Sequence, residues 1–534
     1  MRNCLLSCCV LFLSAISFAA DSPARTCASL KQFSLPNAEI TMAAPVAAGT
    51  FVPPNLKPDE PISPVYKSAP AFCRVMATLR PSNDSDVKVE VWMPASGWNG
   101  KFRGAGNGGF AGYIAYWTLA AAVRQGYAAA STDTGHSTTD ATWALGHPEK
   151  IVDYGYRAVH QMTVDAKAIV KAFYGAESRQ AYFASCSNGG RQGLMEAQRF
   201  PADYEGIIAG APANNWTPML AAGLKYQQVL DGGGYIQPEK VPAIAKAVNA
   251  ACDAQDGVKD GVLNDPRQCH FDPSVLLCKE KDSDECLTGP QAESLKKVYA
   301  GLRDSSGKLL FPGLLPGAED GPGGWQVWAT GEKEGKSLGA FFVIGYFSNM
   351  VYGKKDWDFL GVNVNSAFKM AQEKTGDSLN SNSPDLKAFF ARGGKLIVYH
   401  GWDDPAISAL NTIHYYNRVE SAVGRQTTER SMRVYMVPGM QHCEGGPGAT
   451  AFGQADTAPR GDADHDIFTA LVQWVEKGKA PETIVAFKPS GKSADGGEPA
   501  NGSMTRPLCP YPQSARYKGS GDPNNAASFS CAKN

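Results

Sequence analysis

The chain has 534 residues and a formal net charge of −1, with 43% hydrophobic and 19% charged residues. This length permits a large buried core and more than one domain. The nearly neutral charge, with no block of basic residues, argues against nucleic acid or an anionic membrane surface as a partner. A soluble enzyme or binding protein for small molecules remains.

The first twenty residues have the layout of a secretory signal peptide. Arg2 precedes an apolar run that ends in small residues, so we expect cleavage after Ala19 or Ala20 and a secreted or periplasmic protein. A lipoprotein anchor at Cys8 is the alternative. The run is too short to span a membrane comfortably, and no later stretch reaches about 18 uninterrupted apolar residues, so no membrane span is expected.

The cysteine count predicts disulfides. Thirteen cysteines become ten when those of the signal peptide are removed, and an even number in an exported chain indicates paired cysteines. Closeness along the chain suggests the pairs Cys27–Cys73, Cys252–Cys269, Cys278–Cys286 and Cys509–Cys531. Cys186 and Cys443 remain, far apart in the chain.

Apolar segments alternate with amphipathic ones through much of the chain. Strands are expected at 87–93, 127–131, 181–184, 206–210, 395–399 and 432–437, and helices at 119–125, 156–174, 191–199 and 464–478. A loop dense in glycine, 104–112, follows the first strand. Strands that alternate with helices predict an α/β fold with a parallel, helix-covered sheet.

The alternation stops at about residue 212 and resumes after about residue 385. The intervening residues are rich in cysteine, Asp-containing loops and Gly/Pro stretches. We interpret 212–385 as an inserted domain, which divides the α/β domain into residues 21–211 and 386–534.

Ser187 stands in a sharp turn between a predicted strand and a predicted helix. The sequence Ser185-Cys186-Ser187-Asn188-Gly189 follows the Gly-x-Ser-x-Gly pattern of a nucleophile elbow, with serine at the first glycine position. Small flanking residues allow the strand and helix to approach closely. Ser187 would project above the sheet at the helix N-terminus, where backbone N–H groups face a developing oxyanion. A serine that merely caps a helix is the alternative.

Partners for this serine occur in the order that the fold class requires. A serine hydroxyl needs a base, and the base needs an orienting carboxylate; in α/β-hydrolases the chain order is Ser, Asp or Glu, then His. Asp403 and Asp404 follow the strand at 395–399, and His442 follows the strand at 432–437. Loops at the carboxyl ends of strands carry the sites of open α/β sheets.

The two remaining cysteines flank these candidates. Cys186 precedes Ser187, and Cys443 follows His442. If Ser187 and His442 lie within hydrogen-bond reach, their neighbours can approach disulfide distance. The cysteine count and the order of the candidate triad therefore select the same two places.

On these residues the chain resembles the tannase and feruloyl esterase family, which includes mono(2-hydroxyethyl) terephthalate hydrolase, over essentially the whole mature chain. The hallmark of that family is a Ser-Asp-His triad with a disulfide between the residues beside Ser and His. The resemblance implies an α/β-hydrolase fold with a large inserted lid domain at 212–385. It also favours Asp404 over Asp403, because the acid of the family stands three residues after a glycine, here Gly401.

The same resemblance implies an oxyanion hole. The Asn-Gly-Gly-Phe-Ala-Gly sequence at 107–112 is similar to the oxyanion loop of the family. The backbone N–H of Asn188 would act together with that of Gly108 or Gly109. The alternative for this loop is a flexible turn.

A structural calcium site is the second implied feature. Segment 252–262 places three carboxylates close together among glycines, and Ca²⁺ takes six to eight oxygen ligands. The segment lacks the EF-hand pattern, but it is similar to the calcium loop in the lid of the family. The ligands would be the side chains of Asp253, Asp256 and Asp260 and the carbonyls of Val258 and Val262. An Asp-Gly surface turn is the alternative, and no organic cofactor is expected.

The expected partner is a small aromatic ester. Trp325, Trp328, Trp357 and residues 341–347 offer aromatic surface for a planar acyl group, with ordinary core packing as the alternative, and Ile407 is expected to border the acyl pocket. Terephthalate-type members of the family grip a free carboxylate with a lid arginine, but there is no arginine between Arg303 and Arg392. We therefore rank phenolic esters, hydroxycinnamoyl or galloyl, above terephthalate monoesters.

Two other classes of protein are alternatives. A catalytically inactive binding protein on a hydrolase scaffold predicts a disrupted triad, and none is visible. A peptidase or transferase on the same scaffold is compatible with the same residues. The sequence does not indicate the alcohol half of the substrate or the oligomeric state.

Overall fold

The structure, a computed structural model, describes residues 24–54, 56–57, 60–317, 319–454, 461–490 and 500–533. The predicted signal peptide, 1–20, lies outside these residues. Among the described residues, no helix combines the length and the apolar character needed to cross a bilayer.

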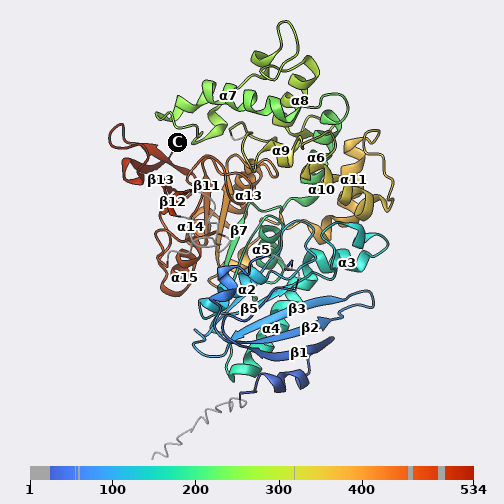
Figure 1. The fold of residues 1–534 in the computed structure, drawn as a ribbon, viewed down its shortest axis with the longest axis vertical. Helices are drawn as coiled ribbons and strands as arrows, with labels where there is room; N and C mark the ends of the chain where they lie inside the picture. The colour runs from blue at the N-terminus through green and yellow to red at the C-terminus, as the bar shows by residue number, and fades with distance from the viewer. Residues whose placement is uncertain are drawn as a thin grey trace, which may run out of the picture.

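A nine-stranded sheet forms the centre of the part of the chain outside residues 212–385 (Figure 1). In sheet order its strands are β1 (Ala38–Val46), β2 (Phe72–Leu79), β3 (Val87–Pro94), β5 (Ala128–Thr132), β4 (Lys101–Ala105), β6 (Gln180–Cys186), β7 (Gly206–Gly210), β10 (Lys395–Gly401) and β11 (Met432–Val437). Neighbours from β5 to β11 pair in parallel. The pairs β1–β2, β2–β3 and β3–β5 are antiparallel. The prediction of a parallel sheet is therefore wrong for its N-terminal part.

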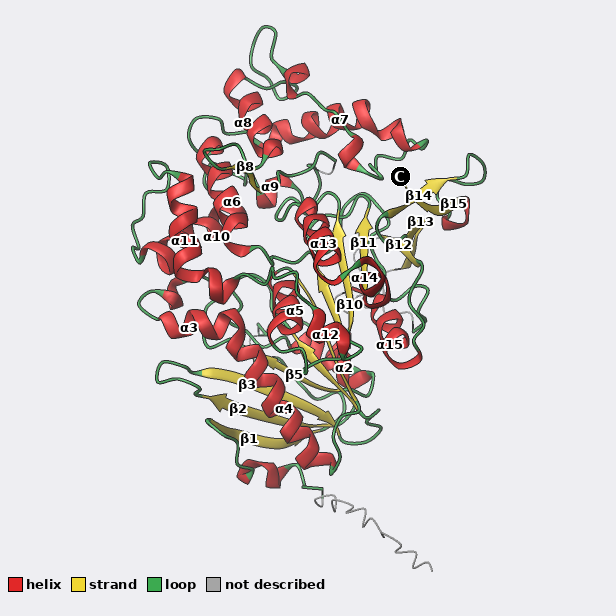
Figure 2. Cartoon of the chain, turned by 180° about the vertical axis from the view of Figure 1, so that it is seen from behind, coloured by secondary structure: helices red, strands yellow, loops and turns green. Residues whose placement is uncertain are grey.

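Helices cover both faces of this sheet (Figure 2). One core layer contains α4 (Ala158–Tyr174), α5 (Asn188–Arg199) and α13 (Ala409–Val423), and the other contains α2 (Tyr116–Arg124) and α15 (Ile467–Lys477). Side chains of each strand alternate between the layers: in β10, Leu396 and Val398 face one, and Ile397 and Tyr399 the other. Because both faces of the sheet are buried, the sequences of such strands are nearly continuous runs of apolar residues.

The residues between β7 and β10 form a separate group of helices, which we call the lid (residues 212–385). Its elements are α6 (Trp216–Leu230), α7 (Val241–Cys252), α8 (Gly289–Ala300), β8 (Leu302–Arg303), β9 (Leu309–Phe311), α9 (Trp325–Trp328), α10 (Leu338–Gly345) and α11 (Val364–Leu379). They gather at the end of the molecule toward which β10 and β11 run (Figures 1 and 2). The lid therefore lies over the carboxyl ends of the parallel strands.

Several elements depart from the expectation. Strands β7 and β11 have the predicted bounds, but β1, β2 and β4 were missed, as were two C-terminal hairpins, β12 (Ile484–Ser490) with β13 (Ala500–Leu508) and β14 (Gln513–Tyr517) with β15 (Phe529–Lys533). Gly104, assigned to a glycine-rich loop, belongs to β4. A Cβ there would lie 2.2 Å from Tyr204 Oη, so this glycine serves close packing inside the sheet and not a turn.

The structure contains the five expected disulfides. Cys27–Cys73 joins the N-terminal turn to β2, Cys252–Cys269 and Cys278–Cys286 lie in the lid, and Cys509–Cys531 joins the C-terminal segments. Cys186–Cys443 connects positions 257 residues apart. It links the end of β6 to the loop after β11, where the candidate site lies.

Candidate active site

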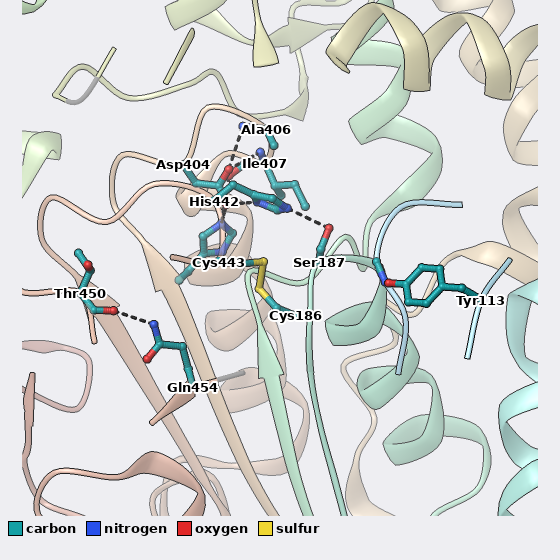
Figure 3. The surroundings of a disulfide bond; sticks show 12 residues. Tyr113, Cys186, Ser187, Asp404, Ala406, Ile407, His442, Cys443, Thr450 and Gln454 are labelled. Carbon is teal, nitrogen blue, oxygen red and sulfur yellow. Dashed lines mark hydrogen bonds and ion pairs between the residues drawn. A yellow bond between two sulfur atoms is a disulfide. The ribbon is translucent and has the colours of Figure 1, made fainter. Parts of the chain in front are cut away.

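Ser187, His442 and Asp404 form one chain of hydrogen bonds (Figure 3). Ser187 Oγ lies 2.9 Å from His442 Nε2, and His442 Nδ1 lies 2.7 Å from Asp404 Oδ2. Because a carboxylate only accepts, Nδ1 carries the proton and Nε2 accepts from the serine hydroxyl. The structure thus brings together the three side chains expected from the sequence, with the Cys186–Cys443 disulfide beside them.

The turn at Ser187 has the strained geometry of a nucleophile elbow. Ser187 has φ +63° and ψ −123°, a conformation that costs energy for a residue with a side chain. Its N–H donates to the Gly210 carbonyl (2.9 Å), and its own carbonyl accepts from the Arg191 N–H (3.0 Å). A Cβ at Gly189 would lie 1.9 Å from Ser185 Oγ. The small residues are therefore needed for the strand and helix to meet.

Four donors surround the buried Asp404 carboxylate. Oδ1 accepts from the backbone N–H groups of Ala406 (2.8 Å) and Ile407 (2.9 Å), and Oδ2 accepts from His442 Nδ1 (2.7 Å) and His400 Nε2 (3.1 Å). Burial acts to raise the pKa of Asp404, but attraction to His442 in its protonated form and the hydrogen bonds from both histidines outweigh it and hold the pKa below its usual value. Asp404 is therefore an ionised anchor for His442.

His400 was given no role from the sequence. Its Nε2 also contacts the Ile407 carbonyl (3.0 Å), and its Nδ1 contacts Thr412 Oγ1 (2.7 Å). The signal that could have identified it is its position at the end of β10, four residues before Asp404. It orients the carboxylate, and among the described residues its ring forms no hydrogen bond with Ser187.

Asp403 faces the lid and not the histidine. A Cβ at Gly317 of the lid would lie 2.1 Å from Asp403 Oδ1, an oxygen without a hydrogen-bond partner among the described residues. Burial raises the pKa of Asp403 well above its usual value, and the negative charge of Glu319 raises it further. The pKa values of the two adjacent carboxyl groups are therefore shifted in opposite directions.

The predicted oxyanion loop lies against the helix that follows Ser187. Gly109, with φ +55°, lines the same cavity as Ser187 and Asn188. Tyr154 Oη bridges the Gly109 carbonyl (2.9 Å) and Asn188 Oδ1 (3.0 Å). The Gly109 carbonyl is therefore held by a side chain from another segment of the chain.

The two candidate glycines differ in their surroundings. The Gly108 N–H donates to Tyr113 Oη (2.7 Å), whereas Gly109 borders the cavity. Figure 3 shows Tyr113 directed toward the Ser187 side of the site. Gly109 is thus better placed than Gly108 to offer an N–H to a reacting ester.

Further side chains hold this loop and were missed from the sequence. His136 Nε2 donates to the Phe110 carbonyl (2.6 Å), and its ring stacks on Trp143 with 4.0 Å between centroids. Burial lowers the pKa of His136 to about 4, so the ring is neutral at pH 7. Arg191 Nε donates to Asn188 Oδ1 (2.7 Å). Nothing in the spacing of His136 marks it, because a separate segment of the chain brings it to the loop, whereas Arg191 lies in the same helix as Asn188.

An apolar cavity of about 110 Å³ extends from Ser187 into the lid. Trp328, Phe342 and Ile407 line it together with Ser187 and His442. Other aromatic candidates lie elsewhere: Trp325 is in the core of the lid, Trp357 stacks on Phe347 and Tyr352, and Phe341 is 43% exposed. The cavity is therefore built by both parts of the chain, and only some of the predicted aromatic residues line it.

The acidic segment of the lid folds into a compact loop ordered by its own carboxylates. Asp253 Oδ1 accepts from the N–H groups of Asp260 (3.3 Å) and Gly261 (3.0 Å), Asp256 Oδ1 from that of Val258 (2.9 Å) and Asp260 Oδ1 from that of Val262 (3.1 Å). Burial raises the pKa of Asp256 to about 6, and the charges of Asp260 and Asp253 add to this. The three carboxylates thus lie in one partly buried loop, where Asp260 also pairs with Arg506.

Comparison with known proteins shows the family to which the chain belongs. Residues 73–532 match the family model described as tannase and feruloyl esterase. The chain is 40% identical over 542 aligned residues to an uncharacterized esterase of Xanthomonas campestris (96% of this chain, 92% of the relative) and 32% identical over 512 residues to a probable feruloyl esterase B-2 of Aspergillus oryzae (94% of each).

Two solved structures share the fold of this chain. Feruloyl esterase B from Aspergillus oryzae superposes with a TM-score of 0.85 at 28% identity, covering 95% of this chain and 99% of that one. A tannin acyl hydrolase from Aspergillus niger, at 23% identity and a TM-score of 0.74 over 95% of this chain and 94% of that one, shares the fold. The protein is a carboxylic-ester hydrolase with an α/β-hydrolase fold. It belongs to the tannase and feruloyl esterase family.

The buried Asp403 generates a prediction about pH. Its folded-state pKa lies above that of the unfolded chain, so its protonation stabilises the fold at low pH, and this stabilisation is lost as the pH rises from about 4 through the folded pKa. Asp403→Asn cannot ionise and should escape this loss. Thermal unfolding at pH 5 and pH 9 should show the Tm of the variant, relative to wild type, rising by on the order of 1–3 °C. The exposed Asp385→Asn is the control, and an equal offset at both pH values would contradict the assignment.

Proposed function

We propose that the protein is an exported serine esterase that hydrolyses esters of phenolic aromatic acids, with Ser187 as nucleophile, His442 as general base and acid, and Asp404 as the anchor of the base. One observation carries the proposal: the Ser187–His442–Asp404 hydrogen-bond chain opens onto an apolar cavity that Gly109 and Asn188 also border. A nucleophile, a base and candidate oxyanion donors at one point are the requirements of acyl transfer.

The chemistry follows from these positions. His442 Nε2 takes the hydroxyl proton as Ser187 Oγ attacks the ester carbonyl, and the tetrahedral oxyanion accepts from the N–H groups of Asn188 and Gly109. The carbon–oxygen bond to the alcohol then breaks, and His442 gives the proton to the leaving oxygen. Water, deprotonated by His442, releases the acid from the acyl-enzyme. Asp404 stays ionised throughout and stabilises the imidazolium.

The chemistry of the cavity favours an uncharged aromatic acyl group. Its volume of about 110 Å³ is close to the roughly 150 Å³ of a cavity that binds benzene. Among the described residues that line it, the only ionisable side chains are those of His442 and Tyr226. Gln227 and Ser408 are neutral polar groups in the wall that could hydrogen-bond to a phenolic hydroxyl. A carboxylate would lose its hydration there without gaining a cationic partner. The names of the relatives, feruloyl esterase and tannin acyl hydrolase, point the same way.

Calcium is proposed as a structural ion of the lid. Asp253, Asp256 and Asp260 offer carboxylate oxygens, and Val258 and Val262 offer carbonyls, so the donor set is the all-oxygen type that Ca²⁺ prefers. Burial is the main cause of the raised pKa of Asp256, and the charges of Asp260 and Asp253 add to it. A bound cation would offset the repulsion among these carboxylates. The ion would order the lid and take no part in the acyl-transfer steps.

Export is supported by the cysteines. Five disulfides are typical of proteins in an oxidising compartment, since cytosolic reductants keep thiols reduced. We therefore propose a periplasmic or extracellular place of action.

The nucleophile is tested by Ser187→Ala. Removing Oγ leaves no atom to form the acyl-enzyme, so kcat/KM on methyl ferulate should fall by about 10³-fold or more. The fold should survive, because the backbone bonds of the elbow do not use the hydroxyl. Circular dichroism and thermal unfolding provide the control. Retention of more than a tenth of the wild-type rate by a well-folded variant would overturn the assignment.

The charge preference of the cavity is tested with two esters of one acid. Dimethyl and monomethyl terephthalate differ in the charge of the distal group. We expect kcat/KM per ester bond to be at least about 10-fold higher for the neutral diester, because a buried unpaired carboxylate costs free energy. Methyl ferulate and methyl gallate should be hydrolysed better than the monoester. A preference for the monoester would favour the terephthalate-type alternative.

The calcium proposal is tested by thermal unfolding. A ligand that binds only the folded state raises the Tm by mass action, so excess chelator should lower the Tm and added Ca²⁺ should restore it. Asp256→Asn should abolish this response. Asp272→Asn, which removes an exposed lid carboxylate outside the loop, should retain it. Identical melting curves of the wild type with chelator and with Ca²⁺ would count against the site.

A further inference from the structure

Part of the lid lies directly on the loop that carries His442. We call residues 313–317 and 319–328 the junction segment. Gln441, the residue before His442, is 1% exposed, and its side chain makes two hydrogen bonds to this segment. Oε1 accepts from the Gly323 N–H (3.1 Å), and Nε2 donates to the Asp320 carbonyl (2.9 Å). A single amide therefore joins the catalytic loop to the lid through both of its functions.

The junction segment also contacts the imidazole itself. The ring of Trp328 meets that of His442 edge to face, with 4.7 Å between centroids and an angle of 70°. Trp328 in turn stacks on Phe342 at 6.0 Å, and both line the cavity. The lid thus contacts the His442 ring directly through Trp328, and it contacts the preceding residue, Gln441, through hydrogen bonds.

The loop of the acid is covered by the same segment. Ser408 Oγ donates to the Gly313 carbonyl (2.5 Å), and Asp403 packs against Gly317, whose N–H donates to Glu319 Oε1 (3.2 Å). Asp403 N–H donates to the Met440 carbonyl (3.1 Å), which connects the two catalytic loops to one another. Both loops therefore pack against one stretch of the lid.

Both sequence neighbours of His442 are consequently fixed to other segments of the chain. Cys443 is bonded to Cys186 beside Ser187, and Gln441 is bonded to the lid. The disulfide restrains the distance to the serine, whereas the Gln441 amide restrains the loop relative to Trp328 and the cavity. A histidine must keep its position to within a fraction of an ångström for efficient proton transfer.

We propose that Gln441 is a positioning residue that couples the seating of the lid to the orientation of His442. The lid then contributes to the chemical step and not only to substrate binding. The inference rests on the proposed role of His442 as the base. It requires that loss of the Gln441 contacts lowers kcat for every ester, including one whose acyl group is too small to fill the cavity.

The test compares Gln441→Met with Gln198→Met. Methionine is close to glutamine in shape but removes both hydrogen bonds. Gln198 on α5 makes the same two-sided contact with another part of the lid, accepting from the Ser383 N–H (2.9 Å) and donating to the Asn380 carbonyl (3.4 Å). It therefore matches the loss of an amide clamp between the catalytic part and the lid, away from His442.

Each variant is assayed with 4-nitrophenyl acetate and 4-nitrophenyl ferulate well below its Tm. For Gln441→Met we expect kcat to fall about 10-fold or more on both esters with KM changed less than about 3-fold, because His442 acts in both acylation and deacylation. Gln198→Met should lower the Tm and leave kcat within about 2-fold. An increase in KM on the ferulate alone, or equal losses of kcat in the two variants, would overturn the proposal.

A second variant approaches the same contact from the lid. A Cβ at Gly323 would lie 2.7 Å from Gln441 Oε1, so Gly323→Ala should displace the amide. This variant leaves every residue of the loop that carries His442 unsubstituted. It should reproduce the kcat defect if Gln441→Met fails to fold. An unchanged kcat in a folded Gly323→Ala would contradict the proposal.

Labelling by phenylmethanesulfonyl fluoride separates this inference from the proposed function. The reagent reports how well the base activates the serine. Wild type should be labelled at Ser187, and Gln441→Met should be labelled at the same residue but about 10-fold more slowly. Labelling of the wild type at another residue would refute the proposed function. Equal labelling rates at Ser187 would refute only the role of Gln441.

Discussion

The structure depends on one contact between distant parts of the chain, that of Ser187 Oγ with His442 Nε2 across 255 residues. Three restraints maintain it. The elbow holds the serine in a strained turn, the Cys186–Cys443 disulfide joins the residues beside serine and histidine, and the Asp404 carboxylate, with four donors, fixes the imidazole. Each restrains a different coordinate: the direction of the hydroxyl, the distance between the loops and the rotation of the ring.

Some of the residues that line the substrate cavity also contact the proposed catalytic residues. Trp328 lines the cavity and contacts His442, and Ile407 lines the cavity while its N–H binds the Asp404 carboxylate. In such an arrangement a change made to alter specificity also alters the base or its anchor. The neutral cavity gains affinity from apolar burial, and the low dielectric of the same cavity strengthens the hydrogen bonds of the triad.

The buried carboxyl groups show how position decides role. Asp403 and Asp404 are adjacent and both buried, yet the pKa of Asp403 is raised and that of Asp404 is lowered. The difference lies in their neighbours, because Asp404 receives donors from two histidines and two backbone amides, whereas Asp403 lies near the negative Glu319. The choice between them came from the resemblance to a family and not from composition. The sequence around the two residues does not indicate which of them will meet the histidines in the folded chain.

Five strands of the parallel part of the sheet (β5, β6, β7, β10 and β11) could be predicted from the sequence alone, together with the helix after the elbow, the pairing of the cysteines and the candidate triad of Ser187, Asp404 and His442. These predictions rest on local patterns or on chain order, which can be read directly from the sequence, except that the choice of Asp404 over Asp403 rests on the family resemblance. The antiparallel strands β1 and β2, the glycine of β4, the support of the oxyanion loop by His136 and the contact of Gln441 with the lid were decided by tertiary structure. They depend on which segments meet, and a periodicity read along the chain does not contain that information, because close packing and hydrogen bonds between distant segments exist only once the sheet and the lid have closed on each other.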